Sequence, residues 1–587
     1  MCGLFGWQLI SGGILGSTVL TNALDSIAHR GPDDSGTYFD DDFGIALGHR
    51  RLSIIDLSNA SHQPMRDRKS GVVIAYNGEL YNFQSLRREL EILGHQFNSK
   101  GDTEVFLRAF IEWGTDCFER CAGMFAVAIW DGRTQSLYLA RDAMGMKPLY
   151  YGKLPNNGGI AFGSEIKAWL QIPEFQAAIN PDSLQQFLGF GYTFDDHQTI
   201  LNDIYKVPPG HYLKIQSGEI KNTQRYFYPP SAISNSTINS EQQLEKVYET
   251  FKQVVSEHLI SDVPVGILLS GGLDSSLLTS FASQQGQVTT ITMAFADSAI
   301  DERNKAKIVA ECFNTKHHEV VISPQDVIDQ IQNKAWLFDD LFADWGAFST
   351  NILYQKCRDM GIKVVLVGEG ADELFAGYGT FVKPQGIQEW QILKLYQRYV
   401  GRRYGRFYLD FRNIFKQYLD KSSGDFCQAV RLFESQRQLP NNYVMKVDKA
   451  SMAASVEARA PFLDRRIAEI AYKLPSNYLL NQTSNKLILR EMARKYNLLP
   501  EEVLKRPKFG ASIASSWIED NPVFRQFARD VILQPNSWCQ RLGLKSTMED
   551  YLIHGKKGYA FPSDLSIFTH IGWRLLLLEL WSSFYLK

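Results

Sequence analysis

The sequence has few cysteines and no marked excess of either charge. Its seven cysteines are an odd number, lie scattered along 587 residues and include no Cys-x-x-Cys pair, so a zinc site or a dense disulfide framework has no support. The 62 Lys and Arg residues nearly balance the 64 Asp and Glu residues, which leaves a formal charge of −2. A globally basic surface for nucleic acid or an anionic membrane is therefore excluded.

Long apolar runs are also missing. The start, residues 1–7, has neither a basic segment nor a long apolar stretch, which argues against a secretory signal. The most apolar stretch near the end, residues 575–580, contains Glu579 and is far shorter than the about 20 residues of a membrane span. We therefore predict a packed helix there, no membrane partner and a cytoplasmic location in which cysteines stay reduced.

What remains is the composition of a globular enzyme, with 44% hydrophobic and 21% charged residues. Residues 1–215 are predicted to form a β-rich domain that includes one helix over 83–93. Short apolar runs lie there between Gly, Asp and Asn turn residues, at 71–76, 124–130, 136–140 and 159–162. The range 216–243, which ends in a polar stretch with paired prolines and many Ser and Asn residues, is predicted as a linker.

Residues 244–587 are predicted to form a second domain. Helical patterns such as 301–312 and 349–360 alternate with apolar runs at 263–269, 288–295, 319–322 and 363–367. This alternation predicts a parallel sheet covered by helices. From about residue 388 the pattern is mainly helical, so the fold class is α/β with a helical C-terminal part.

Cys2 stands directly after the initiator Met. Removal of Met1 would leave a cysteine with a free α-amine, which is a general base attached to the nucleophile. For a second-position cysteine alone, a small buried residue is the commoner explanation. Four motifs that follow in order decide against it, namely HRGPDDSG from residue 29, GHRRLSIID from 48, YNGELYN from 76 and GDTEVF from 101.

With these motifs the first half resembles the glutamine amidotransferase domain of the N-terminal-nucleophile hydrolases, as found in asparagine synthetase. The resemblance implies an αββα fold and a nucleophilic attack by Cys2 on the side-chain amide of glutamine. It also implies that the Asn77 side chain and the Gly78 N–H form the oxyanion hole.

The same resemblance assigns the glutamine-binding residues. Arg51 would hold the α-carboxylate of glutamine and Asp102 its α-amine, with Glu79 in the same pocket. His29 and His49 are interpreted as structural, because a single His flanked by Arg is too weak a pattern for an acid or base role.

A glycine-rich run follows an apolar strand and opens a helix in the second half. Glycines let the backbone approach phosphate, and the N–H groups at a helix start bind anions. The run lacks the Gly-Lys-Ser/Thr ending of a Walker A loop. It is similar to the loop of the ATP pyrophosphatases, which implies that ATP and pyrophosphate are bound by Ser270, Gly271, Gly272, Asp274, Ser275 and Ser276.

A second strand runs into GEGADELFAGY, from Gly368 to Tyr378. Because the carboxyl ends of parallel strands meet at one crevice, we expect Asp274 and Asp372 to share a Mg²⁺ ion that bridges phosphates. The family resemblance implies that Glu369 transfers a proton during ammonia attack.

Three later motifs also resemble asparagine synthetase, at 448–464, 485–490 and 505–510. They imply that Lys486 stabilises charge on the phosphate and the intermediate. Arg459 and Arg506 are interpreted as structural ion-pair residues.

The resemblance covers essentially the whole chain and predicts a glutamine-hydrolysing ligase that uses ATP and Mg²⁺. Cys2 releases ammonia from glutamine, an internal tunnel carries it, and the second site adenylates a small carboxylate acceptor before ammonia displaces AMP. Aspartate is the predicted acceptor, and residues 338–350 are expected to shape its pocket. A homodimer is left open.

Three alternatives are weighed against this hypothesis. The same chemistry on a sugar uronate or a secondary-metabolite intermediate stays open. A non-enzymatic interaction protein is disfavoured by intact Cys2, Asp274, Glu369 and Asp372. A tRNA-modifying pyrophosphatase is disfavoured by the balanced charge and the Cys2 domain.

Overall fold

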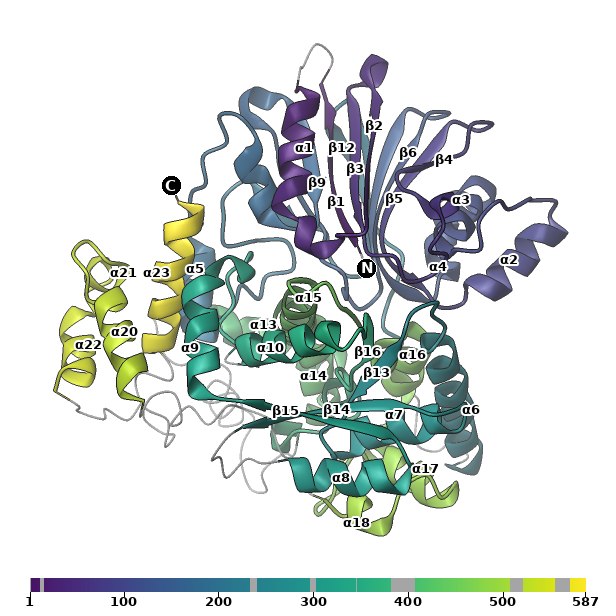
Figure 1. The fold of residues 1–587 in the computed structure, drawn as a ribbon, viewed down its shortest axis with the longest axis vertical. Helices are drawn as coiled ribbons and strands as arrows, with labels where there is room; N and C mark the ends of the chain where they lie inside the picture. Colours follow the sequence, from purple (N-terminus) through teal and green to yellow (C-terminus); the bar gives the residue numbers. More distant parts are fainter. Residues whose placement is uncertain are drawn as a thin grey trace.

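The computed structural model describes residues 2–10, 15–232, 240–295, 302–344, 346–381, 407–506, 521–554 and 571–586. Within these ranges the chain forms two antiparallel sheets in its first half and one parallel sheet in its second. Figure 1 shows the first half, purple to blue, stacked on the second half, teal to green. The predicted α/β class is confirmed.

The first half is a sandwich of two six-stranded sheets. One has the order β10-β8-β9-β1-β3-β2, with β1 (Cys2–Leu9), β2 (Asp34–Asp40), β3 (Ile45–Arg51), β8 (Tyr150–Lys153), β9 (Gly159–Gly163) and β10 (Ile204–Lys206). The other has the order β12-β11-β7-β6-β5-β4, with β4 (Met65–Arg66), β5 (Val72–Leu80), β6 (Gly123–Asp131), β7 (Ser136–Arg141), β11 (His211–Gln216) and β12 (Glu219–Arg225).

The central strands are apolar on both faces because both faces are covered. In β1, Leu4 belongs to the core between the sheets, whereas Phe5 and Trp7 belong to the cluster on the outer face. Helix α1 (Ser17–Ser26) packs on β1 and β3, and α3 (Asp102–Trp113) packs on β5 beside α2 (Phe83–Ile92). This is the αββα layering that the resemblance implies.

The range 216–243, predicted as a linker, is structured at both ends. Residues 219–225 form β12, which pairs with β11 through a tight turn in which Ser217 and Gly218 have φ of +52° and +73°. Most side chains of β12 are exposed, so this edge strand has no apolar pattern that the sequence could reveal. Helix α6 (Ser240–His258) begins before the predicted end of the linker.

The second half is built on a parallel sheet of order β15-β14-β13-β16-β17, with β13 (Val265–Leu268), β14 (Thr289–Phe295), β15 (Lys316–Ile322), β16 (Val364–Leu366) and β17 (Glu457–Arg459). The predicted strands 263–269, 288–295, 319–322 and 363–367 correspond to β13 to β16. Helices surround this sheet, among them α7 (Leu273–Ser283), α8 (Arg303–Cys312), α10 (Gly346–Asp359), α15 (Val444–Met452), α16 (Arg465–Lys473) and α17 (Leu487–Lys495).

The last described helix, α23 (Trp573–Tyr585), returns to the first half and lies beside α5 (Pro181–Phe190) (Figure 1). The Arg574 guanidinium donates to the Leu188 carbonyl at 2.6 Å, and Leu575 to Leu578 are buried. The predicted packed helix is thus present. Across the described parts of the chain, every helix is too short or too polar to span a bilayer.

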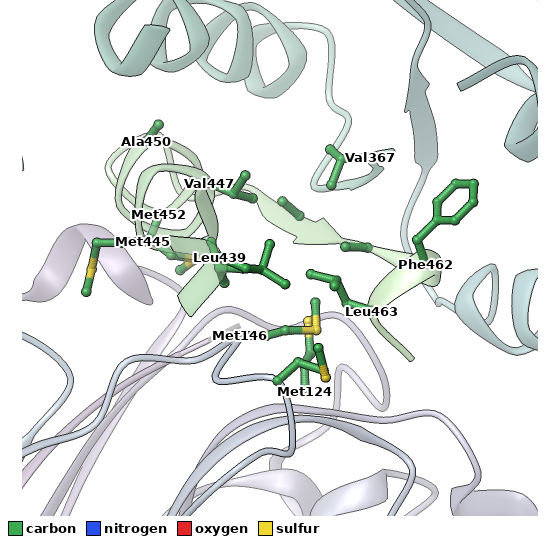
Figure 2. Packing of buried hydrophobic residues seen from close by; sticks show 14 of the residues in the cluster. Met124, Met146, Val367, Leu439, Met445, Val447, Ala450, Met452, Phe462 and Leu463 are labelled. Atoms are coloured by element: carbon green, nitrogen blue, oxygen red, sulfur yellow. The ribbon is translucent and has the colours of Figure 1, made fainter. Parts of the chain in front are cut away.

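Buried apolar and ionic contacts join the two halves. Figure 2 shows Met124 and Met146 of the first half packed near Leu439 and Leu463 of the second. Arg30, fully buried, pairs with Asp448 of α15 through hydrogen bonds of 2.8 and 3.0 Å. The interface is therefore part of the hydrophobic core, and the two sites described next are held in one body.

Candidate functional site

A pocket in the first half brings together residues that the sequence singles out. It is lined by Cys2, Arg51, Gly78, Glu79 and Asp102, and also by Tyr76, Gln63 and neighbouring side chains. We call it the Cys2 pocket. Its residues come from the start of β1, from β5, from the first turn of α3, and from the end of β3 with the segment that follows it, which includes Gln63.

Cys2 and Asn77 are in direct contact. The Cys2 backbone N–H donates to Asn77 Oδ1 at 2.9 Å, and this nitrogen becomes the α-amine when Met1 is removed. Asn77 Nδ2 is buried and has no hydrogen-bond partner among the residues that the structure describes. Burial raises the pKa of the Cys2 thiol. The arrangement therefore places the Cys2 thiol, the nitrogen that would become its α-amine and an unused amide donor side by side.

Gly78 follows Asn77 on β5 and lines the same pocket. A Cβ at Gly78 would lie 2.1 Å from the Met124 carbonyl oxygen of the neighbouring strand β6. Only glycine fits this close approach between strands, which explains the residue type beside the nucleophile.

Arg51 is held by the loop that follows β3. Its guanidinium donates to the carbonyl oxygens of Ile55 at 3.3 Å, Asp56 at 2.5 Å and Ser58 at 3.3 Å. These bonds hold a buried cation at the pocket wall. A guanidinium in this position can pair with a ligand carboxylate.

Asp102, at the start of α3, has the charge opposite to that of Arg51. Its Oδ2 accepts from the Tyr76 hydroxyl and from the Leu80 N–H, both at 2.9 Å. Burial raises the pKa of Asp102, because the carboxylate loses hydration there and has no ion-pair partner among the described residues. An incoming ammonium group would supply that partner.

Glu79 connects the Cys2 pocket to the second half. Its carboxylate lies 3.2 Å from the Arg459 guanidinium of β17, which also pairs with Glu457 at 2.5 Å. Burial and the charge of Asp102 raise the pKa of Glu79, although Arg459 opposes them. Arg459 thus forms buried ion pairs, one of which reaches the pocket.

A second cluster lies where β13 and β16 end. The two strands are neighbours, with Val265 opposite Val364, so the loops that follow them meet, namely 270–276, with the first turn of α7, and 368–374, with the short helix α11 (Ala371–Leu374). We call the cluster formed by these two loops and Lys486 the strand-end site.

The 270–276 loop is organised by its own side chains. The Ser270 N–H donates to Ser275 Oγ at 3.2 Å, and the Gly272 N–H donates to Ser270 Oγ at 3.3 Å, directly before α7 begins. Gly271 has φ +71°, and a Cβ there would lie 2.5 Å from the Lys305 carbonyl carbon. Within the described chain, the buried Ser276 Oγ has no hydrogen-bond partner.

Arg506 supports this loop from outside. Its guanidinium donates to the carbonyl oxygens of Gly271 at 2.8 Å and Lys305 at 3.1 Å. Arg506 also forms an ion pair with Glu502 at 2.9 Å, in line with the structural ion-pair role predicted from the sequence.

The two predicted metal ligands do converge. Lys486 Nζ lies 2.7 and 2.6 Å from the two oxygens of Asp274 and 2.7 Å from Asp372 Oδ1. One cation thus stands between carboxylates from two strand ends. Mg²⁺ is bound in proteins by one or two carboxylates together with phosphate oxygens. Asp274 and Asp372 supply two such carboxylates close enough together to share one cation, so they fit a Mg²⁺ site.

Five more titratable groups lie in or beside the strand-end site. Glu369 lies 3.6 Å from Lys446 of α15, which in turn lies 3.8 Å from Asp344. Tyr378 donates to Glu373 at 2.6 Å, and burial with the charge of Asp372 raises the pKa of Glu373 to about 7. Lys446 stands in no motif that the sequence singles out, whereas Asp344 belongs to residues 338–350, which are predicted to shape the acceptor pocket.

Comparison with known proteins agrees with this two-site geometry. Residues 1–227 match the model of a glutamine amidotransferase domain, and residues 246–566 match that of asparagine synthase. Two relatives come from Bacillus subtilis. Asparagine synthetase [glutamine-hydrolyzing] 1 is 29% identical over 95% of this chain and 92% of its own length. Asparagine synthetase [glutamine-hydrolyzing] 3 is 31% identical over 86% of each chain.

A relative from Escherichia coli, asparagine synthetase B [glutamine-hydrolyzing], is 29% identical over 84% of this chain and 78% of its own length. The matches cover both the sandwich with its Cys2 pocket and the parallel sheet with its strand-end site. The chain therefore belongs to the asparagine synthase family, in its glutamine-hydrolysing amidotransferase form.

Proposed function

We propose that the chain converts aspartate to asparagine with nitrogen from glutamine and energy from ATP. Glutamine is hydrolysed to glutamate and ammonia in the Cys2 pocket. At the strand-end site the acceptor carboxylate displaces pyrophosphate from ATP, and ammonia then displaces AMP from the acyl adenylate. The names of the relatives support aspartate as the acceptor.

The observation that carries the first reaction is the unused Asn77 Nδ2 beside Cys2. A buried donor without a partner costs free energy in the resting protein, and it gains a partner when the attacked amide oxygen becomes negative. The Cys2 α-amine takes the thiol proton as the sulfur attacks. Arg51 and Asp102 hold the two ends of glutamine that do not react.

The second reaction uses the strand-end site. Asp274 and Asp372 would hold Mg²⁺, which when bound neutralises phosphate charge and orients the leaving pyrophosphate. The loop 270–276 offers backbone N–H groups to the phosphates, and Lys486 stabilises the charge that builds up on them. Glu369 accepts a proton from the attacking ammonia.

The two sites are joined by an apolar region through which we propose that ammonia passes. Glu79 of the Cys2 pocket is paired in register with Met124. Met124 lies near Leu463 of the second half, and Val367 lies farther away, beyond Leu463 (Figure 2). Val367 stands two residues before Glu369. Neutral ammonia can cross apolar surroundings, whereas ammonium would lose its hydration there at high cost.

Cys2→Ala tests the separation of the two reactions. We expect it to abolish amide formation from glutamine and to leave amide formation from added ammonium intact. Cys312→Ala, which changes an exposed free cysteine, is the matched control and should keep both. Equal loss of both activities in folded Cys2→Ala protein would refute the two-site assignment, and turnover of a uronate without turnover of aspartate would refute the acceptor.

A further inference from the structure

Three elements bring charged side chains together beside the strand-end site. Asp344 lies just before α10, Lys446 lies in α15, and Glu369 follows β16. Lys446 Nζ is 3.6 Å from Glu369 Oε1 and 3.8 Å from Asp344 Oδ2. Both distances exceed a hydrogen bond, so the ammonium stands between two carboxylates without being bonded closely to either.

The group is held in place yet remains accessible. The Gly346 N–H donates to Asp344 Oδ1 at 2.7 Å, which leaves Oδ2 as the oxygen nearest Lys446. The side chains of Lys446 and Asp344 are 17% and 19% exposed. Burial opposes the charge of Lys446, but Asp344 and Glu369 outweigh it and raise its pKa, so Lys446 is a cation at neutral pH.

The charges of this group do not balance. Asp344 and Glu369 contribute two negative charges and Lys446 one positive charge. An acceptor that carries its own ammonium group would pair with the excess carboxylate, whereas a uronate has no ammonium and would add a negative charge. Like charges brought together in a partly buried site are unfavourable.

We propose that Asp344 and Lys446 make the acceptor site specific for an α-amino acid. Asp344 binds the substrate ammonium and Lys446 binds the carboxylate that is not activated, which leaves Glu369 for proton transfer. The inference rests on the proposed function, because it assigns residues to the acceptor of that reaction.

The test uses aspartate and two analogues that each lack one group. Succinate is aspartate without the ammonium, and β-alanine is aspartate without the α-carboxylate. With MgATP and ammonium as nitrogen source, we measure KM for aspartate and inhibition constants for both analogues. Wild-type protein should bind aspartate about 10- to 100-fold more tightly than either analogue, the effect of one charge-assisted hydrogen bond.

Two variants then assign each contact. Asp344→Asn should raise KM for aspartate about 10- to 100-fold and leave the inhibition constant of succinate unchanged. Lys446→Met should raise KM for aspartate by a similar factor and leave the inhibition constant of β-alanine unchanged. Asp359→Asn and Lys356→Met change exposed residues of α10 and serve as matched controls.

Three results would overturn the inference. One is equal affinity of wild-type protein for aspartate and succinate, which needs no variant. Another is a loss in Asp344→Asn that is as large for succinate as for aspartate. The third is a lower kcat in Lys446→Met with unchanged binding constants, since Lys446 would then position Glu369. Failure of the proposed function is seen separately, as an absence of aspartate turnover by wild-type protein.

Discussion

Asn77 offers the sharpest test of the Cys2 pocket, because its two polar atoms have different roles. Oδ1 accepts from the Cys2 nitrogen at 2.9 Å, while the buried Nδ2 has no partner in the described chain. Asn77→Ala removes both atoms. It should therefore reduce the rate of glutamine hydrolysis much more than it reduces stability.

The magnitudes follow from these contacts. Loss of one oxyanion donor typically lowers kcat about 10²- to 10³-fold, or about 2.7–4 kcal/mol in transition-state stabilisation. The stability cost is limited to the single bond at Oδ1, about 1–3 kcal/mol if the Cys2 nitrogen stays unpaired. Nδ2 contributes nothing to that cost, since it makes no bond in the resting protein.

Asn351 provides a control with the opposite behaviour. It is also fully buried, but its Nδ2 donates to the Ala450 carbonyl at 2.7 Å and its Oδ1 accepts from Lys334 at 3.0 Å. Asn351→Ala loses two bonds and should be the less stable variant, with glutamine hydrolysis preserved below its unfolding temperature.

The assay is glutamate release at saturating glutamine, with urea denaturation on the same samples. Amide formation from ammonium reports the integrity of the strand-end site. If Asn77→Ala hydrolyses glutamine within a few-fold of wild-type protein, the unused donor plays no part in the reaction and the oxyanion assignment is wrong.

Three further outcomes are expected. Burial raises the pKa of Asp102, and an ammonium binds only the ionised carboxylate. KM for glutamine should therefore rise as pH falls through that raised pKa, with Asp102→Asn measured as the reference. A wild-type KM that does not change with pH would contradict this. Glu369→Gln should keep KM for ATP and slow amide formation about 10²- to 10⁴-fold in single turnovers, and an unchanged rate would remove Glu369 from the mechanism. Asp448→Asn removes one of the two buried carboxylates that pair with Arg30, the other being Glu165 at 2.7 Å, and should lower the free energy of unfolding by about 3–5 kcal/mol. Asp33→Asn, in a partly exposed pair, should cost about 0–1 kcal/mol. Equal costs in urea denaturation would show that the buried pair stabilises the fold no more than the exposed one.

Much of the fold and of the two sites could be predicted from local patterns. Strands β13 to β16 were recognisable because parallel strands buried on both faces read as short apolar runs between turn residues. Gly271 was predicted from the resemblance of its run to the ATP pyrophosphatase loop, and the structure gives the reason for the residue type: φ is +71° and the backbone lies close to Lys305, conditions that glycine alone meets without strain. Cys2 by its position alone predicts only a small buried residue, and the four motifs that follow it in order indicate a nucleophile.

Other features had no local pattern. The edge strand β12 is polar along its length, so its backbone pairing with β11 left no periodicity to read. Lys486 contacts both Asp274 and Asp372, whereas the sequence predicts it only as a group that stabilises charge on the phosphate.

The sequence by itself determined which elements form and which residue types stand at their ends, because periodicity and backbone dihedral angles act over a few neighbouring residues. Only the tertiary structure decided that Arg459 reaches Glu79, that Asn77 keeps an unused donor beside Cys2, and that Lys446 lies between Asp344 and Glu369. Such contacts depend on how sheets and helices from distant parts of the chain pack, and packing sets distances that no local pattern encodes.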